Sequence, residues 1–177
     1  MRLFVAVELP ESVLSEAERI SSIIASQDIK ANFVRKEAMH ITMLFLGEVP
    51  EREVQEIKEQ LSRVKHKEFA GVLTRVGVFP SWSFIRVVWL GVEGSGFKEL
   101  HEKIAKALSQ PPMKAFTSHI TLARVKHIAD KPKFVKKLQS ISVENIEFKV
   151  TKFQLMSSVL KPDGPEYTTL AEFKLVE

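Results

Sequence analysis

The chain has 177 residues, of which 45% are hydrophobic, and a formal net charge of +4. This length allows one domain with a substantial core, or two small lobes fused into one. The absence of cysteine excludes disulfides, a thiolate nucleophile and cysteine-bound metal, and no apolar run is long enough to cross a bilayer. The opening MRLFVAVELP lacks the long apolar core and cleavage site of a signal peptide, so we expect a soluble, cytoplasmic protein without a membrane partner.

The periodicity of apolar residues predicts the elements of the first half. Alternation indicates strands, and Pro10 and Pro50 are each placed to begin a helix. The predicted elements are, in order, a strand at 2–8, a helix at about 11–27, strands at 32–34 and 39–46, and a helix from Pro50 through Leu61.

The second half continues the same mixture of strands and helices. The predicted elements are strands at 69–78 and 84–90, a helix from Gly94 to about Leu108, a strand at 119–123, a short helix at 132–138, and strands at 146–158 and 168–175. Because hairpins occur without strict alternation of strand and helix, we expect largely antiparallel sheets and the α+β class. We predict a single domain, 1–177, in which two similar, intertwined lobes are related by a pseudo-twofold axis and line a central groove.

The tetrapeptides HITM at 40–43 and HITL at 119–122 are nearly identical and stand in opposite halves of the chain. Side chains of a strand alternate between its two faces, so His40 and Thr42 share one face, as do His119 and Thr121. If the halves pack about a pseudo-twofold axis, both pairs line one groove. The groove would then hold two imidazoles and two hydroxyls.

Two opposed imidazoles suit in-line attack on phosphorus. Imidazole titrates near neutrality, so one ring can accept a proton from the incoming water while the other protonates the leaving alkoxide. Hydroxyls can hold the non-bridging phosphate oxygens as charge develops. The scheme needs no metal, and the chain has no HExxH or His-x-His motif. We therefore expect neither metal nor cofactor.

The alternative for the repeated motif is a structural hydrogen bond kept in both lobes. Packing alone does not call for a titratable ring at both positions, so we favour the chemical interpretation. The other histidines, His66, His101 and His127, lack this context and are predicted to lie on the surface, His101 on the exposed side of a helix.

Several longer stretches resemble the 2H phosphoesterase superfamily. They are RLFVAVELP at 2–10, HITMLFLGEVP at 40–50, RVVWLGV at 86–92, HITLARVK at 119–126 and GPEYTTL at 164–170. Within that superfamily the chain is similar, from its first strand to its last, to the RNA 2′,3′-cyclic phosphodiesterases, formerly called 2′-5′ RNA ligases. The resemblance implies metal-independent hydrolysis of a terminal 2′,3′-cyclic phosphate to a 2′-phosphate. It also implies reversible 2′-5′ ligation, with tRNA halves as a candidate substrate.

The resemblance assigns roles to individual residues. His40 would be the general acid for the O3′ leaving group, and His119 the general base for water. The substrate-binding residues that it implies are Thr42, Thr121 and Arg124 for the phosphate and Phe45 for the nucleobase. Strict strand alternation places Phe45 and Arg124 on the face opposite to the histidines, so they reach the groove only where the strands bend or end.

The placement of charge along the chain suggests an anionic partner, such as phosphate or nucleic acid. Residues 113–161 hold ten Lys or Arg and three acids, a balance of +7, so the remainder carries −3 of the net +4. A solvated lysine-rich face is the alternative to an RNA-binding face. Trp82 and Phe84, beside Arg86, could stack on RNA bases, with surface packing as the other explanation.

Two other functions stay open from sequence. One is a non-catalytic module that binds RNA ends, and the other is a phosphoesterase for small cyclic nucleotides or 2′-5′ oligonucleotides. The intact His-x-Thr in both motifs argues against a pure binding module, because binding alone needs no proton carriers. We expect a monomer.

Overall fold

Nine strands form one antiparallel sheet in a computed structural model, which describes residues 1–177. The strand order is β7-β4-β5-β6-β3-β1-β8-β9, and β2 pairs with β6 beside β3. The strands are β1 (Arg2–Val7), β2 (Ile29–Phe33), β3 (Ile41–Glu48), β4 (Phe69–Ser81), β5 (Phe84–Glu93), β6 (His119–Ile128), β7 (Glu147–Val150), β8 (Lys152–Lys161) and β9 (Gly164–Lys174). The helices are α1 (Glu11–Ala25), α2 (Val54–Ser62), α3 (Ser95–Ala107) and α4 (Lys131–Ser140), with short 3-10 turns at Lys36–Ala38 and Glu51–Glu53. The antiparallel α+β prediction is confirmed.

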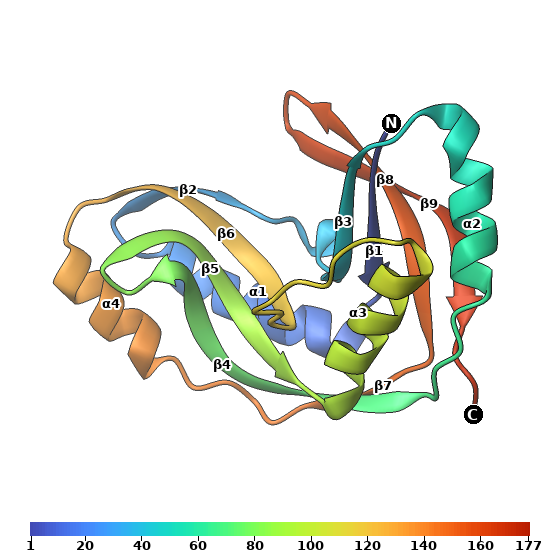
Figure 1. The fold of residues 1–177 in the computed structure, drawn as a ribbon. Coiled ribbons are helices and arrows are strands. Elements are labelled where there is room, and N and C mark those ends of the chain that lie inside the picture. Colours follow the sequence, from blue (N-terminus) through green and yellow to red (C-terminus); the bar gives the residue numbers. More distant parts are fainter.

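The sheet curls into two halves, which Figure 1 shows side by side. One half, called the β6 lobe here, consists of β7, β4, β5, β6 and β2, and the other, the β3 lobe, of β3, β1, β8 and β9. Helices α1 and α4 pack against the β6 lobe, whereas α2 and α3 pack against the β3 lobe. The lobes join where β3 meets β6.

The chain crosses between the lobes several times. Strand β1 lies in the β3 lobe, yet the following helix α1 covers the β6 lobe. Strands β4 and β5 lie in the β6 lobe, yet the following helix α3 covers the β3 lobe (Figure 1). Each lobe is therefore completed by segments from both halves of the sequence.

Apolar helix faces pack on the convex side of the sheet. In α1 the side chains of Val13, Ala17, Ile20 and Ile24 recur at helical spacing and are fully buried. A single cluster of buried apolar side chains includes residues of both lobes. Burying this face leaves the opposite, concave face of the sheet available for polar groups.

Two predicted strands differ most from the observed ones. The strand predicted at 146–158 is interrupted at Thr151, where the chain leaves β4 in the β6 lobe and pairs with β1 in the β3 lobe. The strand predicted at 119–123 continues to Ile128, because β2 supplies a partner for its second half. Periodicity cannot reveal a change of partner strand. No helix has the length and apolar character needed to cross a membrane.

Candidate active site

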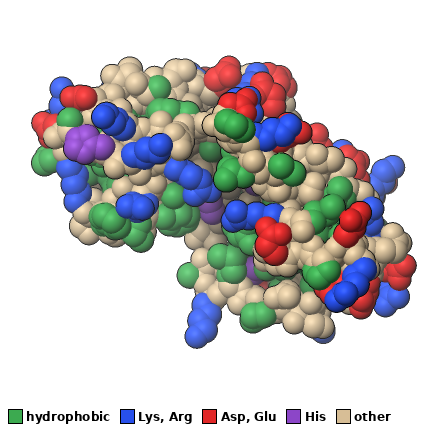
Figure 2. Space-filling model, turned by 90° about the horizontal axis from the view of Figure 1, so that it is seen from above, with side chains coloured by type: hydrophobic (Ala, Val, Ile, Leu, Met, Phe, Trp, Pro, Cys, Tyr) green, Lys and Arg blue, Asp and Glu red, His purple; other side chains and the backbone are tan.

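The two HIT motifs meet at the junction of the lobes. Strands β3 and β6 pair in antiparallel register at Ile41 and Ile120, which are both fully buried. The histidine and threonine of each motif flank its isoleucine and are partly exposed. The register therefore places all four polar side chains on the concave face, each histidine beside the threonine of the other motif. Figure 2 shows histidine side chains in the hollow between the lobes.

The hydrogen bonds of His40 orient its ring. Its Nδ1 lies 2.8 Å from the carbonyl oxygen of Ala38, so the Nδ1–H donates to that oxygen. Its Nε2 lies 2.9 Å from the hydroxyl of Thr42. Because the carbonyl selects the Nδ1–H tautomer of the neutral ring, Nε2 carries a lone pair, which accepts a hydrogen bond from the Thr42 hydroxyl on the concave face.

The ring of His119 is held in the same way but is less constrained. Its Nδ1–H donates to the carbonyl oxygen of Thr117 over 2.7 Å, and its Nε2 makes no hydrogen bond within the protein. In both motifs, the residue two positions before the histidine thus accepts the Nδ1 proton. The arrangement leaves two Nε2 atoms as proton carriers on one surface.

Burial lowers the pKa of both imidazoles below the ordinary value, because desolvation penalises the charged ring. The neighbouring His119 lowers the pKa of His40 further, and the charge of Arg124 lowers that of His119. The carbonyl bonds at Nδ1 partly oppose these effects. The free rings are therefore mainly neutral at pH 7, and an anionic phosphate between them would favour protonation of one.

Phe45 lies on the same face as His40 because a β-bulge interrupts β3. Ala6 of β1 pairs with Thr42, and its neighbour Val5 pairs with Leu44. Met43 therefore has no partner residue in β1 and is the extra residue of the bulge. The bulge reverses the alternation and turns Phe45 to the concave face, where its side chain is 64% exposed. An exposed ring at this place can stack on a base.

An equivalent bulge turns Arg124 to the concave face. Trp89 of β5 pairs with Thr121, and its neighbour Val88 pairs with Ala123, so Leu122 has no partner residue in β5. The guanidinium of Arg124 is exposed. Burial lowers the pKa of His119 and the charge of Arg124 lowers it further, whereas burial raises the pKa of Tyr167, in the other lobe, and the same charge partly offsets that rise. Strict alternation is therefore wrong for Arg124 as it is for Phe45.

Aromatic rings enclose both histidines, and sequence analysis did not identify them as part of the site. Each histidine contacts two rings on other strands of its own lobe. The ring-centroid distances are 4.9 Å for Phe4 and 5.3 Å for Tyr167 from His40, and 5.0 Å for Phe79 and 5.9 Å for Trp89 from His119. These contacts exclude water from the imidazoles and account for the lowered pKa values.

One signal in the sequence could have located Trp89. Its indole covers Gly77 on the neighbouring strand, and a Cβ at Gly77 would stand 2.2 Å from an indole carbon. A glycine in a strand often marks such a close approach. Phe4, Tyr167 and Phe79 give no comparable local signal.

His101 supports the bulge of β3. It is fully buried; its Nδ1–H donates to the carbonyl oxygen of Met43 over 2.7 Å, and its Nε2 accepts from the backbone N–H of Met113 over 2.9 Å. The ring stacks on Phe116 at 4.4 Å. His66 is also buried, and its Nδ1 bonds to the carbonyl oxygen of Lys67 over 2.6 Å. The predicted surface position is thus wrong for His101 and His66, since backbone partners hold their rings inside the protein.

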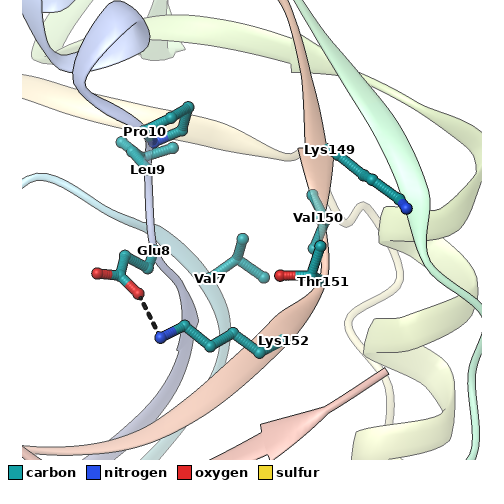
Figure 3. Close-up of a pocket in the computed structure, with 8 residues that line it drawn as sticks. All are labelled: Val7, Glu8, Leu9, Pro10, Lys149, Val150, Thr151 and Lys152. Atoms are coloured by element: carbon teal, nitrogen blue, oxygen red, sulfur yellow. Dashed lines mark ion pairs between the residues drawn. The ribbon is translucent and has the colours of Figure 1, made fainter. Parts of the chain in front are cut away.

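The pocket in Figure 3 lies beside this site and contains no residue of either motif. It is a cavity of about 200 Å³ between the end of β1 and the β7–β8 junction. Its main polar feature is the ion pair of Glu8 and Lys152, 3.0 Å apart, so these two groups are engaged with each other. No three His, Asp or Glu side chains gather as metal ligands anywhere in the chain.

Comparison with known proteins also divides the chain into two segments. The family model described as LigT like Phosphoesterase matches residues 7–89 and 92–167, each segment with one HIT motif. A protein of Archaeoglobus fulgidus named RNA 2′,3′-cyclic phosphodiesterase is 38% identical, over 98% of this chain and 100% of that protein. A protein of Thermotoga maritima with the same name is 35% identical, over 97% of this chain and 94% of that protein.

Solved structures share the fold over nearly the whole length. A Thermus thermophilus protein is 32% identical, with a TM-score of 0.76 over 98% of this chain and 97% of that one. Escherichia coli LigT is 23% identical, with a TM-score of 0.78 over 99% of this chain and 98% of that one, which shows the fold alone.

Proposed function

The chain belongs to the LigT-like phosphoesterase family, and we propose that it hydrolyses 2′,3′-cyclic phosphates at the 3′ ends of RNA. Full-length similarity to proteins named RNA 2′,3′-cyclic phosphodiesterase supports this substrate. The observation that carries the proposal is the placement of two imidazoles on one face about the Ile41–Ile120 pair. Two proton carriers facing one hollow suit a displacement at phosphorus that needs a base and an acid.

In the proposed reaction His119 is the general base and His40 the general acid. The unpartnered Nε2 of His119 accepts a proton from water, and the water oxygen forms a bond to phosphorus. The bond from phosphorus to O3′ breaks, and the protonated Nε2 of His40 gives its proton to O3′. The products are a 2′-phosphate and a free 3′-hydroxyl, and the two rings exchange protonation states.

The difference between the rings supports this assignment. The Thr42 hydroxyl, 2.9 Å from Nε2 of His40, can accept a hydrogen bond from Nε2–H and so stabilise the protonated ring before that proton passes to O3′. His119 has no such partner, so a water molecule can approach its Nε2 directly.

The other residues of the face bind the substrate in this proposal. The hydroxyls of Thr42 and Thr121 donate to the non-bridging phosphate oxygens, and Arg124 pairs with the phosphate charge. The exposed ring of Phe45 stacks on the terminal base. Because the side chains supply both proton transfers, the reaction proceeds without a metal or cofactor.

The same site would support ligation. If an RNA 5′-hydroxyl takes the place of the attacking water, the same displacement at phosphorus forms a 2′-5′ bond, with tRNA halves as candidate substrates. The proposal includes a monomer, since the site needs residues of one chain only, and it keeps the cytoplasmic location expected from the sequence.

The deciding experiment uses a short RNA that ends in a 2′,3′-cyclic phosphate. We expect conversion to the 2′-monophosphate, identified by chromatography against 2′- and 3′-phosphate standards. The chain with His40→Gln and His119→Gln together serves as the control for contaminating activity. A 3′-phosphate product would contradict O3′ as leaving group, and binding without turnover would favour a recognition module.

A further inference from the structure

The concave face of the β6 lobe continues beyond the proposed catalytic site as a basic surface. Arg124 pairs with Asn32 of β2 on one side and with Val87 of β5 on the other. Further along β6, Lys126 and His127 share a bulge opposite Lys30, and all three side chains are exposed. This bulge lies roughly 7–10 Å beyond Arg124, at about 3.3 Å per strand residue.

The basic side chains of this surface have no carboxylate partners. Lys30, Arg86, Arg124 and Lys126 take part in none of the ion pairs of the protein. In contrast, basic residues of the β3 lobe such as Lys152 are paired with glutamates. Figure 2 shows Lys and Arg side chains following one another over the left-hand lobe toward the hollow, whereas the right-hand lobe mixes both signs of charge.

An exposed aromatic residue borders the basic surface. Phe84 is 57% exposed at the start of β5, and the guanidinium of Arg86 lies 5.5 Å from the centre of its ring. Trp82, in the preceding turn, is 36% exposed. Lys131 of α4 bonds to the carbonyl oxygen of Ser83 and so ties this hairpin to the lobe. A flat ring held beside unpaired cations is the combination that binds single-stranded nucleic acid.

We propose that this surface, defined by Lys30, Phe84, Arg86, Lys126 and His127 and called the RNA track, binds the nucleotides that precede the terminal cyclic phosphate. The inference rests on the proposed function, since it needs a substrate longer than one nucleotide. The terminal phosphate lies at the histidines, so the strand runs from there in the 5′ direction toward the β4–β5 hairpin. The backbone phosphates pair with the basic side chains, and a base stacks on Phe84.

Continuity with the catalytic site favours RNA over an acidic protein as the occupant. The RNA track adjoins Arg124, which in the proposed function holds the terminal phosphate. An acidic peptide has no terminal cyclic phosphate to bind at that point, so nothing would fix it beside the catalytic site. The proposal also names the substrate class, a single-stranded 3′ end of several nucleotides, in preference to a free cyclic nucleotide.

The test compares binding and turnover of a substrate and its fragment. A labelled single-stranded octamer ending in a 2′-phosphate gives Kd by fluorescence anisotropy, and KM is measured for the cyclic octamer and for a cyclic mononucleotide. In the variant Lys30→Gln, Arg86→Gln, Lys126→Gln, we expect the octamer Kd and KM to rise roughly tenfold or more. The slope of log Kd against log salt should fall by about 2, since each single-strand phosphate contact contributes about 0.7. Mononucleotide kinetics should not change.

A matched variant removes the same charge from the other side of the molecule. This variant carries Lys58→Gln, Lys106→Gln and Lys174→Gln, on α2, α3 and β9, and none of these lysines forms an ion pair. We expect its Kd for the octamer to stay within about twofold of the wild-type value. Phe84→Ala should weaken octamer binding roughly 5- to 100-fold without changing the salt slope.

The outcomes separate the two proposals. If the two triple variants bind the octamer equally well, or if the wild type has the same KM for octamer and mononucleotide, the RNA track is refuted while the proposed function stands. If neither substrate is hydrolysed, the proposed function fails, and the anisotropy and salt-slope results still decide whether the RNA track binds the strand.

Discussion

Ile41 and Ile120 face each other in antiparallel register at the point where β3 and β6 meet. The pair acts as a local twofold axis, because the residues on either side of it are a histidine and a threonine in both strands. Burial of the isoleucines against the core turns their polar neighbours to the opposite face. One hydrophobic contact thus brings together two motifs that are far apart in the sequence.

Replacement of either imidazole should remove most of the activity. We expect His40→Gln and His119→Gln each to lower kcat about 10²- to 10⁴-fold, the usual contribution of one proton-transfer group. Because the rings act as a pair, the double variant should be only slightly slower than the worse single variant. Kinetics with the cyclic octamer measure the rates, and thermal unfolding checks the fold. Fully additive losses would contradict a coupled acid–base pair.

The pH dependence should be displaced toward acid. Burial lowers the pKa of both rings from the ordinary 6.5, so the singly protonated pair that carries the reaction is populated below that pH. We expect a bell-shaped kcat/KM with its maximum below about pH 6.5, and a kcat profile extended to higher pH, because bound phosphate favours the protonated ring. A kcat/KM maximum above about pH 8 would be incompatible with these environments.

The two motif threonines should contribute through their hydroxyls rather than their shape. Thr42→Val and Thr121→Val keep the volume and remove the donor, so we expect each to lower kcat roughly 10- to 100-fold, with little change in Tm. Thr74→Val is the matched control, because the buried hydroxyl of Thr74 has no hydrogen-bond partner. Equal activity of all three variants would exclude phosphate contacts by Thr42 and Thr121.

His101 should affect activity through the position of β3. His101→Leu leaves the carbonyl of Met43 and the N–H of Met113 without partners, which should cost ~2–4 kcal/mol in the free energy of unfolding. Relaxation of the bulge should also lower kcat, while His101→Gln, which can donate and accept, should recover part of both losses. Urea unfolding and turnover with the cyclic octamer measure the two effects. A loss of stability with unchanged kcat would show that the site does not depend on this bond.

Chelation should not affect turnover. In the proposed reaction the two imidazoles supply both proton transfers, so prolonged dialysis against EDTA should leave kcat within about twofold of its starting value. The same dialysed enzyme is then assayed with added Mg²⁺, Mn²⁺ and Zn²⁺. Loss of activity that one of these ions restores would assign a metal to the mechanism.

The sequence by itself was sufficient for the fold class and for the placement of histidine and threonine on one face within each motif. Alternation along β3 and β6 is a local property, and it places His40 beside Thr42, and His119 beside Thr121, whatever their surroundings. Hairpins and helical periodicity likewise predict an antiparallel α+β protein, because each helix or strand is recognised from its own short stretch of sequence.

The tertiary structure decided which other residues join the two motifs. Phe45 and Arg124 reach the concave face through bulges, and a bulge exists only relative to the number of residues in the partner strand. His101 is buried, and Tyr167 meets His40, because segments distant in the sequence pack against them. Alternation and hydropathy describe one strand or helix at a time, so they could determine the motifs but not the partners with which the folded chain surrounds them.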